Sequence, residues 1–347
     1  MQNRNVDIII PVYNVEEDIL FRCISSIACQ SIIKELEITI VDDASDKKFI
    51  DVYDSVVNRF KGLLDIKLLR YEVNGGPGVA RQYGLDHTSN NYIMFMDADD
   101  TLNGSFACKI LRTALEADNG IYILSVGAFD EVKEYDVPDE QSPIYIPYNE
   151  NLIWVFGKMY RRSFLDKYNI RFHPTSRSNE DNGFNTIIRL ISNKEEQINF
   201  IPDHVYYWHE NLNSITRTND HHYTFGTSTS DSFYGYVENI LYALEVVKKY
   251  NIPSDMLNEW ILHCMLYLYS YYLEAYTKAQ ESACIHFNWC KRFYDEAYKP
   301  IEHDISYALL CEQYTILMRK LYSRNRHNFD NIIPHITIFD FLNELKK

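Results

Sequence analysis

Short apolar runs alternate with amphipathic segments through the first third of the chain, and this alternation restricts the fold more than any other feature. Strand-like runs at 6–11, 37–41 and 65–71 are each followed by a stretch with helical character. Strands that alternate with helices of about 12 residues are typical of βαβ units and parallel sheets. The sequence therefore predicts a mostly parallel, doubly wound, Rossmann-like α/β sheet.

A further apolar run at 91–96 ends abruptly in three carboxylates, Asp97, Asp99 and Asp100. Such a run is typical of a buried strand that surfaces at the carboxyl end of a sheet, where open α/β sheets bind ligands. Oxygen ligands suit Mg²⁺ or Mn²⁺, and such an ion can hold a diphosphate. The alternative is a solvated acidic turn that caps the next helix, with Asp100 or Thr101 as N-cap.

Composition limits the partners and the compartment. The 347 residues include 34 Lys and Arg against 49 Asp and Glu, a net charge of −15, which argues against a nucleic-acid surface. A polyanionic ligand then needs a local device, such as a metal ion or a few placed basic side chains. We expect no signal peptide and no membrane span, because the first strand begins at once and no run of 18 apolar residues occurs. Seven cysteines without a CxxC pair are typical of buried thiols in a cytoplasmic protein.

The second half of the chain changes character. Further elements are expected at 104–117, 120–128, 162–168 and 181–194, with sheet-edge pieces at 200–202 and 205–208. Long amphipathic helical stretches then dominate from about residue 228. We therefore expect an α/β domain over 1–225 and an all-helical domain over 226–347. The Tyr-rich run 265–276 predicts a helix that packs on several sides, and we expect this domain to contribute to a homo-oligomer.

A series of motifs occupies the expected strand ends and turns. They are PVYN at 11–14, VDDAS at 41–45, NGGPGVARQYGL at 74–85, DADD at 97–100, FGKMYRR at 156–162, NED at 179–181 and YYWHENLNSIT at 206–216. In order and spacing they resemble the family-2 glycosyltransferases of the GT-A fold. The resemblance covers about residues 5–218 and leaves the helical domain uncovered. The whole series is far more specific than any one motif.

The resemblance implies a metal-dependent, inverting glycosyltransferase. It would move a sugar from a nucleotide-sugar, with UDP as the expected nucleotide, to a hydroxyl acceptor such as a glycan or teichoic acid. An inverting transfer needs a base for the acceptor hydroxyl, and Asp181 of the NED motif corresponds to it. Asp99 corresponds to the ligand of a divalent ion, Mn²⁺ or Mg²⁺, that neutralises the leaving nucleoside diphosphate. His209 is a further candidate ligand of this ion.

The other expected roles concern the donor and the acceptor. Asp43 corresponds to a carboxylate that accepts a hydrogen bond from the imide N–H of uracil, and Asp97 to one that faces the ribose or sugar. Arg81 follows a Gly-rich turn and can approach the diphosphate or ribose. The full set expected at the donor is Pro11, Val12, Tyr13, Asn14, Asp43, Gly76, Arg81, Asp97 and Ala98. Lys158 and Glu180 are candidates for contacts with the acceptor or a phosphate.

Each of these assignments has a structural alternative. Asp43 can cap the turn after its strand, and Arg81 can form a surface salt bridge. The acidic residues at 180–181 can offset the dipole of the helix that follows them. His209 can pack at the edge of the core.

Other functions on the same fold also remain open. A non-catalytic nucleotide-sugar or glycan-binding protein would lose the metal or base carboxylate, whereas this chain retains Asp99 and Asp181. A nucleotidyltransferase would open with a basic, Gly-rich loop, and PVYNVEED is neither basic nor Gly-rich. The turn at 74–78 is not a P-loop, because no Gly-Lys-Ser/Thr follows it. The sugar and the acceptor stay open, since acceptor loops vary within one fold.

Overall fold

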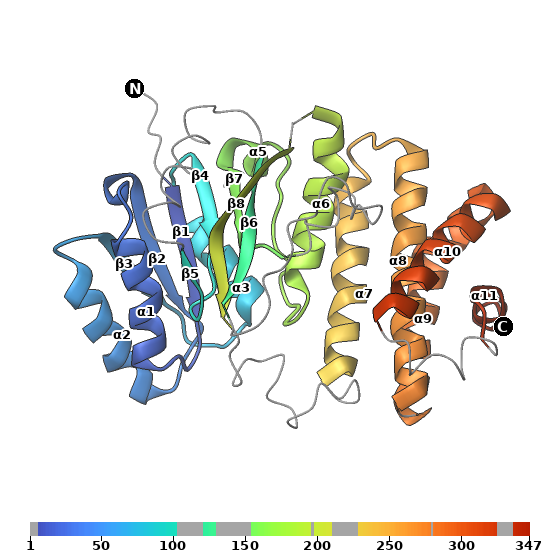
Figure 1. Ribbon diagram of the computed structural model, residues 1–347, viewed down its shortest axis with the longest axis horizontal. Helices are drawn as coiled ribbons and strands as arrows, with labels where there is room; N and C mark the ends of the chain where they lie inside the picture. The colour runs from blue at the N-terminus through green and yellow to red at the C-terminus, as the bar shows by residue number, and fades with distance from the viewer. Residues whose placement is uncertain are drawn as a thin grey trace. The chain divides into compact units, whose positions relative to one another are not determined.

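The computed structural model describes residues 6–102, 121–129, 154–195, 198–209, 228–278, 280–324 and 336–347 (Figure 1). The chain divides into two compact units, Met1–Asn211 and Leu212–Lys347, which are considered separately. The expected domain boundary at 225/226 and the expected helix at 104–117 lie outside the described residues.

The first unit is built on a mixed sheet with the strand order β3-β2-β1-β4-β7-β6-β8-β5. Its strands are β1 (Val6–Val12), β2 (Leu36–Asp42), β3 (Asp65–Arg70), β4 (Tyr92–Phe95), β5 (Thr101–Leu102), β6 (Ile121–Phe129), β7 (Lys158–Arg161) and β8 (Ile198–His209). β1 pairs in parallel with β2 and β4, and β2 pairs in parallel with β3, as the alternation of strands and helices predicts. β7 runs antiparallel to both β4 and β6, so the second half of the sheet is mixed.

Helices cover the sheet on both faces. The helices of this unit are α1 (Glu17–Ala28), the 3₁₀ turn η1 (Ile33–Glu35), α2 (Lys47–Phe60), α3 (Pro77–Asp86), α5 (Arg162–Lys167) and α6 (Glu180–Glu195). Ile8 and Ile10 of β1 join the core cluster that α1 and α2 complete. Ile9 points to the opposite face, where α3 packs so closely that a Cβ on Gly84 would lie 2.5 Å from the Ile9 side chain. This alternation along β1 confirms the doubly wound α/β layout.

The last long strand corrects one expectation. The sequence predicts two short edge pieces at 200–202 and 205–208, whereas the structure has the continuous strand β8. β8 pairs in parallel with β6 through two register shifts and antiparallel with the short β5. The shifts absorb the irregularity that interrupts the sequence pattern. β8 consequently brings residues 206–209 beside the end of the DADD turn.

A closed polar network lies at the amino end of the parallel strands. Arg162 follows β7, and its Nη2 donates to the buried Asp7 carboxylate (3.0 Å) and to Thr88 Oγ1 (2.8 Å). Its Nε donates to the Asn90 carbonyl (2.7 Å), and its Nη1 donates to the Leu85 carbonyl (3.2 Å). Asn90 in turn donates to both oxygens of Asp7. This network ties the antiparallel strand β7 to β1 and β4.

The second unit is helical, as expected. It contains α7 (Ser228–Val247), α8 (Ser254–Lys278), α9 (Gln280–Phe293), η3 (Tyr294–Tyr298), η4 (Lys299–Asp304), α10 (Tyr307–Arg324) and α11 (Ile338–Leu345). α8 contacts α9, α10, α11 and η3, and its residues Leu268, Tyr269 and Leu273 are buried. The Tyr-rich run therefore packs on several sides, which confirms that prediction. The homo-oligomer stays a prediction, which light scattering at micromolar concentration tests.

Two general expectations can be compared with this architecture. Among the helices that the structure describes, none has both the length and the hydropathy that a membrane-spanning segment requires. The cysteines within the described residues are free thiols. Cys29 and Cys284 are exposed, so the expectation of uniformly buried thiols is wrong for these two.

Candidate active site

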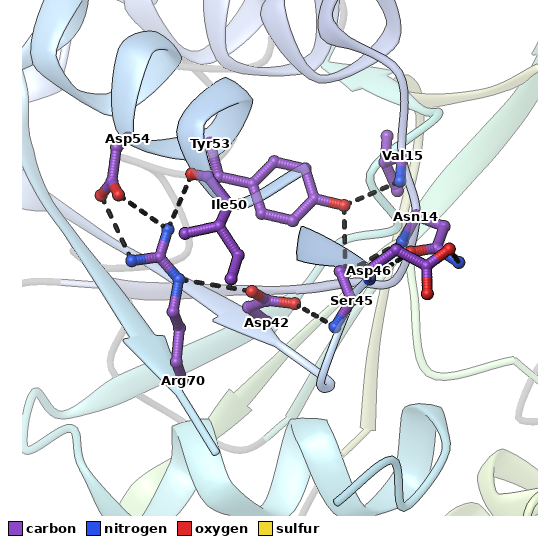
Figure 2. A network of polar contacts seen from close by, with 9 residues as sticks. All are labelled: Asn14, Val15, Asp42, Ser45, Asp46, Ile50, Tyr53, Asp54 and Arg70. Carbon is purple, nitrogen blue, oxygen red and sulfur yellow. Dashed lines mark hydrogen bonds and ion pairs between the residues drawn. The ribbon is translucent and has the colours of Figure 1, made fainter. Parts of the chain in front are cut away.

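The turns that follow β1 and β2 are joined by a polar network (Figure 2). The hydroxyl of the buried Tyr53 accepts a hydrogen bond from the Val15 amide (2.7 Å) and lies 3.2 Å from Ser45 Oγ. Asn14 has a left-handed backbone (φ 53°). Its side-chain oxygen accepts from the Asp46 amide (2.8 Å), and its Nδ2 donates to the Asp46 carboxylate (3.2 Å). The sequence predicts a donor contact for Asn14, and the structure shows that its amide first serves to hold the two turns together.

The neighbouring PVY residues differ in what they offer a ligand. Tyr13 is 44% exposed, so its ring is accessible, and Pro11 is half-buried. Val12 is buried in the core, which leaves only its main chain for a ligand. The Tyr13 ring and the main chain are thus what this segment can offer a ligand, and the expected donor contacts of Pro11, Val12 and Tyr13 stay predictions.

Asp43 is the most completely hydrogen-bonded carboxylate in this region. Its Oδ1 accepts from the Tyr71 hydroxyl (2.6 Å) and the Gly75 amide (2.7 Å). Its Oδ2 accepts from Asn74 Nδ2 (3.0 Å) and the Gly76 amide (2.8 Å). Burial and these contacts with Asp43 raise the pKa of Tyr71. A hydrogen bond from a base to Asp43 would have to replace one of these four. The contacts with Tyr71 and the Gly-rich turn carry no signal in the sequence that predicts them.

The Gly-rich turn that Asp43 holds packs directly on the loop before α6. Gly76 has a φ of +88°, and a Cβ there would lie 3.3 Å from the Arg177 Cα. A Cβ on Gly78 would lie 2.8 Å from Glu180 Cβ. Arg177 Nη2 also donates to the Asn74 carbonyl (2.8 Å). Glycine is therefore required at 76 for its backbone conformation, and at 78 for the close approach of the first turn of α6, which carries the predicted base.

Arg81 connects the donor side of the predicted site with the acceptor side. Its guanidinium is 5% exposed; Nη2 donates to Asp97 Oδ1 (2.6 Å), and Nη1 donates to Glu180 Oε1. Burial opposes the charge, but the carboxylates of Asp97 and Glu180 outweigh it and raise the pKa of Arg81. The Nε of Arg81 is buried without a hydrogen-bond partner. The surface salt bridge offered as the alternative is therefore wrong, because this ion pair is buried.

The DADD turn presents its three carboxylates differently. Asp97 and Asp99 are half-buried, and Ala98 between them is buried. Arg22 of α1 also binds the main chain of the turn, because its Nη2 donates to the Asp99 carbonyl (2.6 Å). Asp100 is fully buried and points into the fold. The alternative of a wholly solvated acidic turn is wrong for Asp100.

Asp100 binds the end of β8, and this connection was missed in the sequence. Its Oδ2 accepts from the Tyr206 hydroxyl (2.5 Å), and its Oδ1 accepts from the His209 amide (2.8 Å). The His209 ring also lies near the turn, with Nε2 2.8 Å from Thr101 Oγ1. Burial, together with the charges of Asp97 and Asp99, raises the pKa of Asp100. YYWH at 206–209 resembles a family motif, but nothing in the sequence pairs Tyr206 with an aspartate.

Asp181, the predicted base, begins α6 next to Glu180. Burial and the adjacent Glu180 charge raise the pKa of Asp181 to about 7, although its side chain keeps part of its surface accessible. Lys158 of β7 is buried and donates to the carbonyls of Trp154 and Phe156 (3.4 Å to the second). Burial lowers the pKa of Lys158 to about 7, against the opposite effect of Asp181. The expected contacts of Lys158 and Glu180 with acceptor or phosphate stay predictions, and both groups would have to leave their present partners.

The donor set at the turn can complete a divalent-ion site but cannot form one alone. Within the described residues, no three His, Cys, Asp or Glu side chains converge as a metal-binding group. Mg²⁺ commonly binds one or two carboxylates plus substrate phosphates and waters. Arg81 contacts only Oδ1 of Asp97, and the half-buried Asp99 lies two residues away on the same turn. These residues fit an ion that a diphosphate helps to hold.

Comparison with known proteins gives this geometry a family. Residues 7–178 match the family described as "Glycosyl transferase family 2", and this range contains the turns around Asp43, Arg81 and Asp97. The chain carries a family-2 glycosyltransferase domain. The match stops just before Asp181 and does not reach the helical unit.

Two curated relatives share low sequence identity with the chain. A protein of Bacillus spizizenii named poly(ribitol-phosphate) β-glucosyltransferase is 25% identical over 265 residues, which are 73% of this chain and 39% of the relative. Staphylococcus aureus TarS, named poly(ribitol-phosphate) β-N-acetylglucosaminyltransferase, is 26% identical over 72% of this chain and 43% of its own length. The chain thus spans less than half of either relative.

Solved structures extend the similarity to both units. A TarS fragment, residues 1–349 in complex with UDP-GlcNAc, superposes with a TM-score of 0.67 at 16% identity and covers 92% of each chain. A mannosyltransferase from Pyrobaculum calidifontis in complex with GDP-Man and Mn²⁺ superposes with a TM-score of 0.51 at 16% identity, over 93% of this chain and 82% of that one. These likenesses concern the fold, and they confirm the GT-A α/β core followed by a helical region.

Proposed function

We propose that this family-2 domain is an inverting, metal-dependent glycosyltransferase that moves a sugar from a UDP-sugar to a hydroxyl of an acceptor. One observation carries the proposal: Arg81 joins Asp97, on the expected donor side, to Glu180, the neighbour of the predicted base. The proposed donor site and the proposed base would therefore be linked through one buried arginine. The raised pKa of Asp181, about 7, suits a group that must accept a proton near neutral pH.

The residues supply each step of an inverting transfer. The acceptor oxygen attacks C1 of the sugar from the face opposite the leaving group, and the C1–O bond to the diphosphate breaks as the new glycosidic bond forms. The Asp181 carboxylate takes the proton of the attacking hydroxyl. Glu180 stays bound to Arg81, which fixes the first turn of α6 against the donor side. Asp97, held by Arg81 through Oδ1, faces the donor.

Asp99, with Asp97 beside it, would hold the divalent ion together with the two phosphates. When bound, Mn²⁺ or Mg²⁺ supplies positive charge that stabilises the departing nucleoside diphosphate. The structure supports a ligand role for Asp99 through its half-buried position on the turn. His209 lies close enough to the turn to join this set, although its Nε2 lies beside Thr101.

UDP and the acceptor class follow from the relatives. TarS was solved with UDP-GlcNAc, and both curated relatives are named for poly(ribitol-phosphate). We therefore propose a UDP-sugar donor and an acceptor hydroxyl on a teichoic-acid-type or related surface polymer. The net charge of −15 makes a metal-assisted grip on the donor more important than it would be in a basic protein.

The test is release of nucleoside diphosphate from UDP-glucose, UDP-GlcNAc and GDP-mannose, with Mn²⁺, Mg²⁺ or EDTA, with and without poly(ribitol phosphate). We expect turnover with a UDP-sugar and Mn²⁺, stimulation by the polymer and no turnover in EDTA. Asp99→Asn should abolish the metal-dependent turnover, whereas Asp51→Asn, an exposed carboxylate on α2, should leave it unchanged.

Each part of the proposal fails separately in this experiment. Turnover in EDTA equal to that in Mn²⁺ would exclude the metal role of Asp99. A preference for GDP-mannose would exclude the uridine assignment. Nucleotide binding without any turnover, across all donors and acceptors, would favour the non-catalytic binding protein.

A further inference from the structure

The hydroxyl of Tyr206 joins the two ends of the DADD turn, in addition to the main-chain hydrogen bond from the Asp100 amide to the Asp97 carbonyl (3.2 Å). It donates to Asp100 Oδ2 (2.5 Å) and accepts from the Asp97 amide (3.1 Å). A phenol has one proton to donate, so the donor and acceptor roles of this hydroxyl are both in use. The backbone at Asp97 and the side chain of Asp100 are therefore fixed through one atom.

The ring of Tyr206 is itself held in place. It is fully buried and stacks on Phe156, with 5.1 Å between the ring centroids and 11° between the planes. Phe156 stacks in the same way on Trp154 (5.7 Å, 10°) and forms a bridge with Phe95, the last residue of β4. Packing of the ring consequently fixes the position of the Tyr206 hydroxyl beside the turn.

The partner of this hydroxyl is also fixed on its other side. Asp100 Oδ1 accepts from the His209 amide (2.8 Å) at the end of β8, and Thr101 of β5 pairs with Tyr207 of the same strand. The turn is thus attached to β8 at both carboxylate oxygens of Asp100. Asp97, proposed to face the donor, and Asp100 both bond to Tyr206, and Asp99, proposed to bind the metal, lies between them in the turn.

We propose that Tyr206 is a positioning residue that sets the geometry of the Asp97–Asp99 turn for donor and metal, through its bonds to Asp97 and Asp100. The inference rests on the proposed function, because it assigns Tyr206 to the site that binds the nucleoside diphosphate. Tyr206 does not touch the reacting atoms. A polar group held by a buried hydroxyl keeps one orientation, and a preorganised ligand set binds its ion and its phosphates more tightly than a mobile one.

The test is Tyr206→Phe, which removes one oxygen and keeps the ring stack. Calorimetry measures UDP affinity as a function of Mn²⁺ concentration in the full chain, and no turnover is needed. We expect UDP affinity in saturating Mn²⁺ to fall about tenfold, the usual size of one lost charged hydrogen bond, and the Mn²⁺ requirement to rise. In turnover, the KM for the UDP-sugar should rise more than kcat falls.

The matched control is Tyr269→Phe in the helical unit. Tyr269 is equally buried and also loses a 2.5 Å hydrogen bond, to the Ile336 carbonyl. Tyr269→Phe should therefore lower the free energy of unfolding by a similar amount without changing UDP affinity or the Mn²⁺ requirement. Equal UDP affinity and Mn²⁺ requirement in the two variants would overturn the role of Tyr206. Absence of UDP binding by the parent protein would instead overturn the proposed function, and the inference with it.

A second variant covers the case in which Tyr206→Phe fails to fold. Asp100→Asn keeps the volume and one acceptor oxygen but weakens the bond from Tyr206. We expect it to weaken UDP binding in the same direction. Where Tyr206→Phe folds, the double variant should lose less than the sum of the two single effects, since both substitutions act on the Tyr206–Asp100 hydrogen bond. Additive losses would show that Tyr206 and Asp100 act independently, which contradicts the proposal.

Discussion

Two arginines, the half-buried Arg162 and the buried Arg81, lie near opposite ends of the parallel strands and are bonded very differently. Arg162 meets one carboxylate, two main-chain carbonyls and a hydroxyl, and each of its three nitrogens donates to the protein. Arg81 meets two carboxylates, Asp97 and Glu180, and its Nε is buried without a partner. The first network is complete, whereas the second concentrates charge and leaves a donor unused.

The difference shows what each end of the sheet does. Asp7, the one carboxylate bound to Arg162, is fully buried and also accepts two hydrogen bonds from Asn90, so this end serves stability. At the other end, burial raises the pKa of both Asp100 and Asp181. Crowded carboxylates with raised pKa values are costly for folding and are typical of functional sites. The carboxyl end therefore concentrates buried carboxylates at a cost to folding, whereas the amino end forms a fully bonded network.

The largest effect on stability should come from Arg162→Met, because it leaves Asp7 as an uncompensated buried charge. We expect a loss of about 3–5 kcal/mol in the free energy of unfolding, measured by denaturant titration. UDP affinity of the folded fraction should be unchanged. Arg59→Met is the control, since Arg59 pairs with Glu17 on the surface and should cost less than about 1 kcal/mol. A loss no greater than that of the control would remove the distinction between the two ends.

The largest effect on activity should come from Asp181→Asn. We expect transfer to fall by about 10²-fold or more, the range for a lost general base, while UDP affinity stays the same. Stability should stay equal or rise, because the variant removes a carboxylate whose ionisation burial opposes. A loss of UDP binding as large as the loss of transfer would show that Asp181 has a structural role. The carboxyl end of the strands would then serve stability, as the amino end does.

A smaller effect separates two roles for Asp43. Asp43→Ala should weaken UDP binding by about 1–3 kcal/mol, because a charged hydrogen-bond partner is lost. If Asp43 accepts a hydrogen bond from the base, the variant should lose more affinity for uridine diphosphate than for guanosine diphosphate. If Asp43 mainly anchors Gly75 and Gly76, both nucleotides should weaken equally. Calorimetry with the two diphosphates decides, and full affinity for UDP would exclude both roles.

Local patterns in the sequence were sufficient to predict where the strands end. They were not sufficient to predict which side chains from distant segments contact one another there. The alternation of strands and helices predicted β1 to β4, and the motifs predicted that residues near Asp43, Arg81 and Asp97 share one sheet edge. The antiparallel course of β7 was not predicted, because its four residues carry no signal of direction. Long-range pairs such as Tyr206 with Asp100, 106 residues apart, depend on register, which a single sequence does not reveal.

The same limit explains Arg81 and Lys158. A basic residue near a predicted phosphate site is naturally assigned to the phosphate. Arg81 instead pairs with Glu180, 99 residues away, and Lys158 turns to the carbonyls of Trp154 and Phe156. Both outcomes depend on burial, and burial of a polar side chain follows from tertiary packing that local composition does not encode.

The smallest predicted effect is the pH dependence of transfer, and it sharpens the contrast between the two sheet ends. Because the pKa of Asp181 is raised to about 7, the base is protonated in acid and deprotonated above neutrality. The kcat/KM for the acceptor should therefore rise with pH and level off above about 7, with a value about tenfold lower one unit below the pKa. Stability should move the other way: a carboxyl whose folded pKa exceeds its unfolded value of about 3.9 binds its proton more strongly in the folded state. Its contribution to the free energy of unfolding therefore decreases as pH rises from about 4 to about 7.

Asp181→Asn supplies the control for both curves. It should remove the rise in residual transfer rate between pH 6 and 7, and it should flatten the decrease in stability over the interval from about 4 to 7. Arg162 pairs with Asp7 at the other end of the strands and does not contact Asp181. Arg162→Lys, which retains the positive charge, should thus lower stability without moving the midpoint of the pH–rate profile. A midpoint near 7 that persists in Asp181→Asn would assign the titration to another group, with Lys158 the first candidate because burial lowers its pKa to about 7 as well.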